Sequence, residues 1–181
     1  MRKPWTGVCA ATLMATALAV PAHAQELHSK IGYPDGILCI APEGGSGANG
    51  VSITTVPCDP AYPSYFWYLQ YVRMAVFQNP FAKEPLYWIR NSGTGKCLDL
   101  TDGRTADWTP LQQWDCTDTD GQLWAFSPMG AFNKIKNFRS RQCMDVRAGS
   151  GEVGAIIQNY RCANLPDGTE NLAQLWAWGP H

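Results

Sequence analysis

Six of the seven cysteines fall into three pairs, and the two members of each pair lie nineteen positions apart. The pairs are Cys39 with Cys58, Cys97 with Cys116, and Cys143 with Cys162. Thiols in such a set either form disulfides or bind a metal, and zinc sites typically include Cys-x-x-Cys or paired histidines. No such motif accompanies these pairs. The regular spacing therefore predicts three disulfides, each closing its own loop, and no metal site.

The seventh cysteine, Cys9, lies in an N-terminal segment that has the features of a signal peptide. Two basic residues precede an apolar run from Val8 to Val20, and Ala22-His23-Ala24 is typical of a cleavage site. The run is too short for a membrane-spanning helix. We therefore expect residues 1–24 to be a signal peptide and the rest of the chain to be secreted, where its six cysteines would be oxidised.

The charge and histidine content exclude several classes of function. Removal of the two basic residues of the N-terminal segment takes the formal charge from −1 to −3. A mildly acidic chain lacks the basic surface that binds nucleic acid or anionic membranes. His28 and His181 would remain, each near a terminus, so catalysis by a Ser-His-Asp or Cys-His set lacks a base. We expect no enzyme activity, no cofactor, no nucleic acid and no membrane insertion.

After residue 25 the chain shows short β-type runs separated by clusters of Gly, Asp, Asn and Pro, without helical periodicity. The runs predict four strands around each cysteine pair. These are residues 29–32, 37–41, 51–58 and 65–72 for the first pair, 86–91, 96–100, 111–116 and 122–126 for the second, and 133–137, 142–146, 155–162 and 174–178 for the third.

A repeated tripeptide follows the cysteine pairs. It is Gln122-Leu123-Trp124 after the second pair and Gln174-Leu175-Trp176 after the third, with Tyr65-Phe66-Trp67 after the first. A small repeated unit cannot bury its apolar face alone, and association around a shared axis also removes exposed sheet edges. We therefore predict an all-β fold, a β-trefoil of three four-stranded repeats in one domain. The domain spans residues 25–181 and its repeats about 27–72, 86–128 and 132–178.

The spacing between the repeats is uneven. The first and second cysteine pairs start 58 positions apart, whereas the second and third start 46 apart. The surplus lies in residues 71–85, which include Val76, Phe77 and Phe81. We expect an elongated hairpin or loop, whose apolar side chains either cover the open end of the barrel or form a docking surface.

Two stretches resemble the ricin B-type lectin domain, a β-trefoil family with a repeated Gln-x-Trp motif. The first contains Gly95-Lys96-Cys97-Leu98-Asp99-Leu100, Leu111-Gln112-Gln113-Trp114-Asp115-Cys116 and Gln122-Leu123-Trp124. The second contains Cys143-Met144-Asp145-Val146, Ile157-Gln158-Asn159-Tyr160-Arg161-Cys162 and Gln174-Leu175-Trp176. With the three cysteine spacings, the resemblance covers nearly all of residues 27–178. It implies shallow sugar-binding pockets, one potential pocket per repeat.

The resemblance also implies which side chains bind the sugar. A carboxylate accepts hydrogen bonds from neighbouring hydroxyls, a glutamine adds a polar group, and an aromatic ring packs against the apolar face of the sugar. In this order the positions hold Asp99, Gln112 and Trp114 in the second repeat, and Asp145, Gln158 and Tyr160 in the third.

The chain departs from the family pattern in two respects. The first repeat has Ala41, Thr54 and Val56 at the three positions, so we expect it to be structural. The family pattern also places Asn directly before the Gln-x-Trp glutamine, where this chain has Gly121 and Ala173. Affinity and sugar preference depend on what replaces that Asn.

Further positions are assigned as follows. We expect the three repeated tryptophans in the core and the glutamines of the Gln-x-Trp motifs bonded to the backbone or to the aspartates. Asp120 or Asn171 is the candidate replacement for the missing Asn. Trp108 is expected to be exposed before Pro110, at the edge of the pocket in the second repeat.

The function that these observations favour is a secreted, non-enzymatic carbohydrate-binding protein with two pockets and a glycan or polysaccharide as its partner. One alternative is a binding or delivery subunit, or an adaptor, of a secreted complex such as a toxin, docking through residues 71–85. A further alternative is a trefoil inhibitor of a secreted enzyme.

Overall fold

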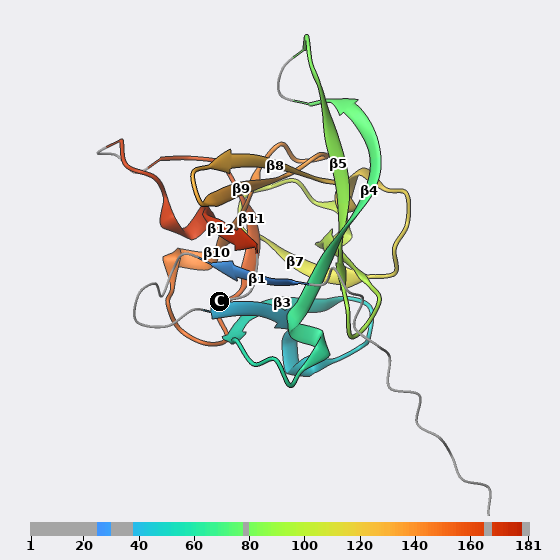
Figure 1. Ribbon diagram of the computed structural model, residues 1–181, viewed down its shortest axis with the longest axis vertical. Helices are drawn as coiled ribbons and strands as arrows, with labels where there is room; N and C mark the ends of the chain where they lie inside the picture. Colours follow the sequence, from blue (N-terminus) through green and yellow to red (C-terminus); the bar gives the residue numbers. More distant parts are fainter. Residues whose placement is uncertain (1–24, 30–37, 78–79, 165–167, 179–181) are drawn as a thin grey trace, which may run out of the picture.

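The computed structural model describes residues 25–29, 38–77, 80–164 and 168–178 (Figure 1). The expected signal peptide, residues 1–24, and His181 lie outside these ranges. The described residues form twelve strands and no α-helix. The strands are β1 Gln25–Ser29, β2 Leu38–Pro42, β3 Val51–Pro57, β4 Phe66–Val76, β5 Lys83–Asn91, β6 Cys97–Leu100, β7 Thr109–Trp114, β8 Trp124–Met129, β9 Phe132–Asn137, β10 Cys143–Val146, β11 Ile157–Tyr160 and β12 Trp176–Trp178.

Each strand overlaps its predicted range, but the ends differ by up to four residues. Strands β4 and β5 are longer than predicted, at Phe66–Val76 and Lys83–Asn91 against 65–72 and 86–91. Strands β8 and β12 begin at the tryptophan of the Gln-x-Trp motif, because the residues up to each glutamine form a 3₁₀ turn. These turns are η4, Asp120–Gln122, and η6, Leu172–Gln174. Strand β1 overlaps the predicted range 29–32 only at Ser29, and residues 30–32 fall outside the described part of the chain.

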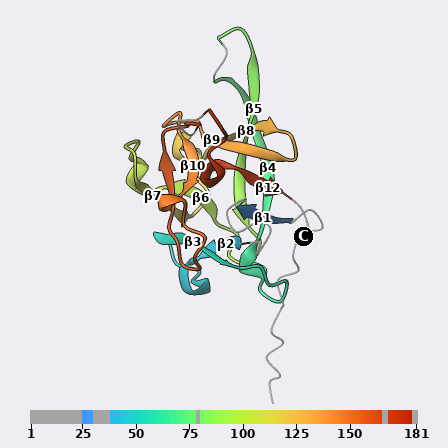
Figure 2. The same ribbon diagram turned by 90° about the vertical axis from the view of Figure 1, so that its left-hand side faces the viewer.

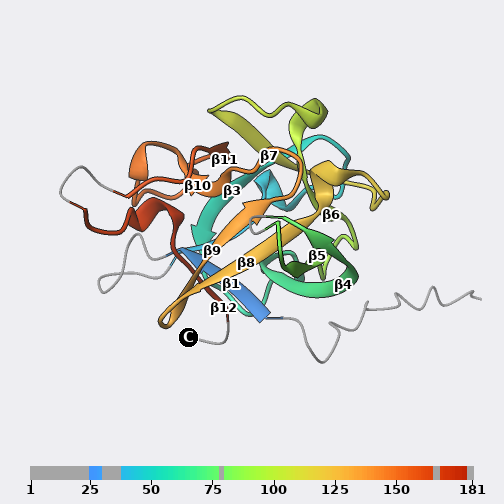
Figure 3. The ribbon, with the colours of Figure 1, turned by 90° about the horizontal axis from the view of Figure 1, so that it is seen from above.

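Six strands pair in a closed antiparallel ring. Strand β1 pairs with β4, β4 with β5, β5 with β8, β8 with β9, β9 with β12, and β12 with β1. The remaining strands form the hairpins β2–β3, β6–β7 and β10–β11, and β7 pairs with both β3 and β11. In Figure 3, β3, β7, β10 and β11 lie on one side of the molecule and β1, β4, β5, β8 and β12 on the other. The fold is therefore all-β and resembles a barrel with three added hairpins.

Three tryptophans occupy the centre of the hydrophobic core, as predicted. Trp67, Trp124 and Trp176 are each 0 % exposed. Each indole Nε1 donates to a backbone carbonyl, at 2.9 Å to Ile40, 3.1 Å to Leu98 and 3.0 Å to Met144. Because a buried N–H without a partner is costly, this bond is what allows so large a ring to be fully buried.

The three predicted disulfides are present. The Cα atoms of Cys39 and Cys58 lie 5.0 Å apart, those of Cys97 and Cys116 5.1 Å, and those of Cys143 and Cys162 5.0 Å. Closing a loop of this length contributes about 3 kcal/mol in the chain-entropy model. We call residues 39–58, 97–116 and 143–162 the first, second and third cysteine loops.

The cysteine loops are bonded to one another through one buried side chain each. Gln113 of the second loop donates to the carbonyl oxygens of Ser46 and Ala48 in the first, at 2.6 and 2.9 Å. Asn159 of the third loop donates to Ala106 of the second at 3.2 Å. The hydroxyl of Thr55, in the first loop, donates to Glu152 of the third at 2.7 Å. The three loops are therefore joined in a closed cycle.

Strands β4 and β5 extend beyond the barrel as a long hairpin, which projects upward in Figures 1 and 2. Their pairing runs from Trp67 opposite Asn91 to Val76 opposite Lys83, with a register shift near Val72. Most of the described surplus residues, 71–77 and 80–85, therefore belong to the outer part of a hairpin, which is one of the two expected conformations.

The apolar side chains of this hairpin divide between two environments. Phe77 is 6 % exposed and packs in a small cluster with Leu86 and Leu123. Phe81 and Val76 are 96 % and 47 % exposed. The expectation that these side chains cover the barrel is therefore right for Phe77 and wrong for Phe81 and Val76, because the projecting hairpin carries the latter away from the barrel.

Two absences hold for the described residues. They include no helix long and apolar enough to cross a membrane. They also include no group of three or more His, Cys, Asp or Glu side chains placed to hold a metal ion.

We predict that Gln113→Ala lowers the free energy of unfolding by about 2 kcal/mol, because it leaves the hydroxyl of Thr94 and two loop carbonyls without their partner. The matched control is Gln70→Ala, which removes one bond from Arg90 on the hairpin and should cost less than about 1 kcal/mol. Chemical denaturation checks both values. Equal losses in the two variants would contradict the proposed role of Gln113 in joining the loops.

Candidate functional site

The strand register brings the candidate residues together in two of the three cysteine loops. In each hairpin the aspartate lies opposite its glutamine, and the first cysteine lies opposite the aromatic residue. The pairs are Asp99 with Gln112 and Cys97 with Trp114 in the second loop, and Asp145 with Gln158 and Cys143 with Tyr160 in the third. Residues that are opposite, or two apart along a strand, share a face of the sheet. Each carboxylate therefore shares a face with its glutamine and its aromatic ring.

Asp99 and Trp114 line one hollow of about 270 Å³, which we call the Asp99 pocket. Asp99 is 9 % exposed at its base, whereas Trp114 is 40 % exposed. Asp102 and Arg139 add charges of opposite sign to the wall. The remaining lining residues are Gly103, Thr117, Thr119, Gly121 and Gln122.

Asp145 and Tyr160 line a second hollow of about 260 Å³, which we call the Asp145 pocket. Asp145 is 4 % exposed. The ring of Tyr160 lies against that of Trp108, with centroids 4.6 Å apart and planes inclined by 54°. The remaining lining residues are Ala148, Gly149, Asn171 and Ala173. This pocket thus has two aromatic side chains where the Asp99 pocket has one.

The two predicted glutamines hold the carboxylates. Gln112 Nε2 donates to Asp99 Oδ2 at 3.1 Å, and Gln158 Nε2 donates to Asp145 Oδ1 at 2.8 Å. The glutamines are 5 % and 0 % exposed, and neither is among the residues that line the hollows. Their amides therefore orient the aspartates without lining the hollows themselves.

The glutamines of the Gln-x-Trp motifs bond to the backbone, as expected. Gln122 Nε2 donates to the carbonyl of Asp115 at 3.0 Å, and its Oε1 accepts from the amide of Thr117 at 2.7 Å. Gln174 Nε2 donates to the carbonyl of Arg161 at 2.9 Å and also to Asp145 Oδ2 at 3.1 Å. Gln122 thus fixes the backbone on both sides of Cys116, and Gln174 fixes the backbone just before Cys162.

Burial changes the acidity of both pocket aspartates. Desolvation raises the pKa of Asp99 and of Asp145 above the ordinary value of 3.8, while the amides of Gln112, Gln158 and Gln174 partly oppose the shift. The charged form of each carboxyl is therefore short of hydrogen-bond donors compared with water. Hydroxyl groups of a ligand would supply such donors.

The first cysteine loop has the same register without the polar groups. Ala41 lies opposite Thr54, and Cys39 lies opposite Val56. These pairs match those of the other two loops, so the positions compared in the sequence are equivalent in the structure. No carboxylate or aromatic ring stands at these positions of the first loop.

The position that holds Asn in the family pattern has different surroundings in the two pockets. At Gly121 a Cβ atom would lie 3.2 Å from Asp99 Oδ1, so a side chain there would crowd the carboxylate. Ala173 is 5 % exposed, and Asn171 beside it lines the Asp145 pocket. Of the two candidate replacements, Asn171 lines a pocket, whereas Asp120 is bonded to Arg73 at 2.8 Å and is not among the residues lining the Asp99 pocket.

The position of Trp108 differs from the prediction that it lies at the edge of the pocket in the second repeat. Trp108 is 53 % exposed, as expected, but it lines the Asp145 pocket of the third loop and not the pocket of its own second loop. The reason is the pairing of β7 with β11, in which Thr109 lies opposite Asn159 and carries Trp108 to Tyr160. Pairing between distant strands has no signal in the local sequence.

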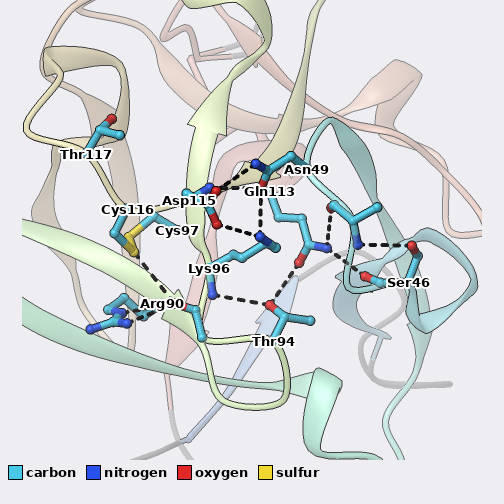
Figure 4. A network of polar contacts seen from close by, with 12 residues as sticks. Ser46, Asn49, Arg90, Thr94, Lys96, Cys97, Gln113, Asp115, Cys116 and Thr117 are labelled. Carbon is cyan, nitrogen blue, oxygen red and sulfur yellow. Dashed lines mark hydrogen bonds and ion pairs between the residues drawn. A yellow bond between two sulfur atoms is a disulfide. The ribbon is translucent and has the colours of Figure 1, made fainter.

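A polar network surrounds Asp115 at the end of strand β7 (Figure 4). Asp115 accepts from Lys96 Nζ at 2.6 Å and from Asn49 Nδ2 at 2.8 Å. These bonds lower the pKa of Asp115, in contrast to the two pocket aspartates. Because Asp115 directly follows Trp114, the network fixes the end of the strand that carries the exposed ring.

The family comparison agrees with these features. Residues 76–160 match the model described as "Ricin-type beta-trefoil lectin domain-like". The resemblance to the ricin B-type lectin domain is therefore confirmed for this part of the chain, and a lectin-like domain supports carbohydrate binding.

Solved structures show the same fold at low identity. The designed three-fold symmetric protein ThreeFoil is similar with a TM-score of 0.71 and 18% identity, over 88% of this chain and 99% of that one. An exo-beta-1,3-galactanase from Clostridium thermocellum gives 0.72 and 24%, over 90% of this chain but only 31% of the galactanase. The C-half of an earthworm R-type lectin, in complex with GalNAc, gives 0.59 and 15%, over 88% and 99%.

We predict opposite pH dependences for the pocket aspartates and Asp115. A pKa raised by folding means that Asp99 stabilises the protein most below about 3.8, and this contribution is lost as the pH rises through the raised pKa. The stability of the parent relative to Asp99→Asn should therefore fall as the pH rises from below 3.8 through the raised pKa.

The control is Asp115→Asn. The lowered pKa of Asp115 gives a contribution that is present above about 3.8 and is lost as the pH falls, so the difference between parent and variant should rise with pH. Denaturation at several pH values measures both trends. The same trend in both variants would contradict the burial of Asp99.

Proposed function

We propose that this protein is a secreted, non-enzymatic carbohydrate-binding protein that uses the Asp99 pocket and the Asp145 pocket. The single observation that carries the proposal is that each hollow has a buried carboxylate and an accessible aromatic ring in its wall. A sugar has the complementary surface, because its ring has an apolar C–H face and a rim of hydroxyls.

The roles of the residues follow from their positions. Asp99 and Asp145 accept hydrogen bonds from two neighbouring hydroxyls, while Gln112 and Gln158 hold the carboxylates in place. Trp114 in one pocket packs against the sugar face, as does Tyr160 in the other.

We infer that the twelve strands form three four-stranded units, β1–β4, β5–β8 and β9–β12, as in a β-trefoil. Three features that recur once per unit support this inference. Each unit has a hairpin closed by a disulfide, a buried tryptophan bonded to a carbonyl of that hairpin, and a side chain bonded to another cysteine loop. The two proposed pockets lie in the second and third units.

The partner and location follow from the same features. The disulfides and the lectin-like domain are consistent with an extracellular protein. Each pocket is shallow and buries little ligand surface, so a single site should bind weakly. Useful affinity would come from two sites that engage one multivalent glycan or polysaccharide.

We predict that Asp99→Asn and Asp145→Asn each weaken saccharide binding at their own pocket about tenfold or more, because a charge-assisted acceptor is lost, and that the double variant loses binding. A glycan and polysaccharide array on the oxidised protein, followed by calorimetry, measures the effect. The control is Asp118→Asn, which removes an exposed carboxylate from an ion pair with Arg73. A folded double variant that binds the panel like the parent would contradict the proposal.

A second candidate function is supported by the projecting hairpin. Its outer part exposes Tyr71 at 56 %, Met74 at 46 %, Val76 at 47 % and Phe81 at 96 %. Exposed apolar side chains grouped on one element are typical of a surface that contacts another protein. The protein would then be a binding or delivery subunit of a secreted complex, attached through residues 71–85.

We predict that Tyr71→Ser combined with Met74→Ser and Val76→Thr abolishes attachment to such a partner and leaves saccharide binding unchanged. Cross-linking with mass spectrometry identifies the partner, and Val153→Ser, at a residue that is 60 % exposed elsewhere, is the control. Recovery of the same stoichiometric partner by the parent and the triple variant would contradict the hairpin as its docking site.

A further inference from the structure

Trp108 has a backbone conformation that a bulky residue rarely adopts. Its φ is +69°, in the left-handed region that glycine favours. The equivalent positions of the other two cysteine loops, four residues before Thr54 and Gln158, are Gly50 with φ +79° and Gly154 with φ +87°. The turn before each of these strands thus requires a positive φ, and in two loops out of three glycine meets the requirement without strain.

The surroundings of Trp108 keep it in this conformation. Its amide donates to the carbonyl of Asn159 at 3.0 Å, and its own carbonyl accepts from Arg147 Nη2 at 3.2 Å. Arg147 Nε also donates to Gln158 Oε1 at 2.9 Å, and Gln158 in turn holds Asp145. The backbone of Trp108 is therefore tied to the same group of side chains that positions the carboxylate.

Hydrophobic burial does not account for a tryptophan at this position. The side chain is 53 % exposed, in contrast to the fully buried Trp67, Trp124 and Trp176. Gly50 makes the equivalent turn beside Trp114, where a Cβ would be 3.6 Å from the ring. Left-handed backbone at non-glycine residues is strained and is concentrated at functional sites. A strained and half-exposed tryptophan thus requires a role other than folding.

We propose that Trp108 is a ligand-binding and specificity-determining residue of the Asp145 pocket, an inference that rests on the proposed carbohydrate-binding function. Its ring packs against that of Tyr160, with centroids 4.6 Å apart and planes inclined by 54°, so the wall of this pocket has two aromatic rings at an angle to each other. A wall of two rings fits a saccharide of two or more sugar units, each of which presents a C–H face.

The Asp99 pocket lacks this extension. Its aromatic ring is Trp114 alone, and its wall also contains the charged side chains of Asp102 and Arg139. We therefore assign a single sugar unit to the Asp99 pocket and an oligosaccharide to the Asp145 pocket. The difference between the pockets comes from Gly50, which lies beside Trp114 at the position equivalent to that of Trp108.

The test measures stability and binding in the same variants. The Asp99→Asn background removes the contribution of the other pocket, and the probes are galactose, glucose and xylose with their β-linked disaccharides and trisaccharides. Trp108→Gly should keep or raise the midpoint of thermal unfolding, because the strain is relieved, and should weaken di- and trisaccharide binding roughly tenfold. Monosaccharide binding should change less than threefold, as expected for a ring that contacts the second sugar unit.

Two further variants separate the ring from the backbone. Trp108→Phe keeps an aromatic ring on the strained backbone and should retain most of the oligosaccharide binding. Gly50→Trp adds a ring beside Trp114, and in an Asp145→Asn background it should strengthen disaccharide binding at the Asp99 pocket. Calorimetry measures all these affinities.

The outcomes distinguish this inference from the proposed function. If Trp108→Gly unfolds more easily than the parent and binds the trisaccharides equally well, while Asp145→Asn abolishes binding, Trp108 is structural and this inference is overturned alone. If neither Asp145→Asn nor Trp108→Gly changes the binding of any probe, the proposed function fails, and this inference fails with it. A loss of trisaccharide binding without a loss of stability supports the inference.

Discussion

A buried indole hydrogen bond connects the core of this protein to its pockets. In the second cysteine loop Trp124 donates to the carbonyl of Leu98, and in the third Trp176 donates to the carbonyl of Met144. Leu98 and Met144 directly precede the pocket aspartates in the sequence. The same contact that permits burial of a large ring therefore holds the strand that presents each carboxylate, so the pocket geometry depends on core packing. An amide from the facing strand then fixes the carboxylate itself.

The three cysteine loops use one backbone with different side chains. Ala41 and Thr54 pair in the first loop as aspartate and glutamine pair in the other two. Because the disulfide, the tryptophan bond and the backbone pairing do not depend on the side chains at these positions, the side chains change without loss of the hairpin. A scaffold of this kind separates stability from binding: the first loop retains the structural contacts alone, while the second and third add a buried carboxylate and an accessible ring.

Closure of the cycle of loops also determines the shape of one pocket. Gln113, Asn159 and Thr55 each join their loop to another, and the pairing of β7 with β11 lies along the same contacts. Trp108 enters the Asp145 pocket across this junction, so that pocket includes residues from two cysteine loops. Its two-ring wall exists only when the loops are assembled.

The sequence by itself determined the disulfide pairing, the all-β class, the buried tryptophans and the surplus of residues at 71–85, because spacing and local alternation encode them directly. It also aligned Asp99 with Asp145, and the strand register agrees. Tertiary structure decided that Phe77 is buried while Phe81 is exposed, that Gln112 and Gln158 are buried and do not line the hollows, and that Trp108 belongs to the neighbouring pocket. These outcomes depend on which distant strands pair and on how far a hairpin projects, and no local pattern of residues specifies either.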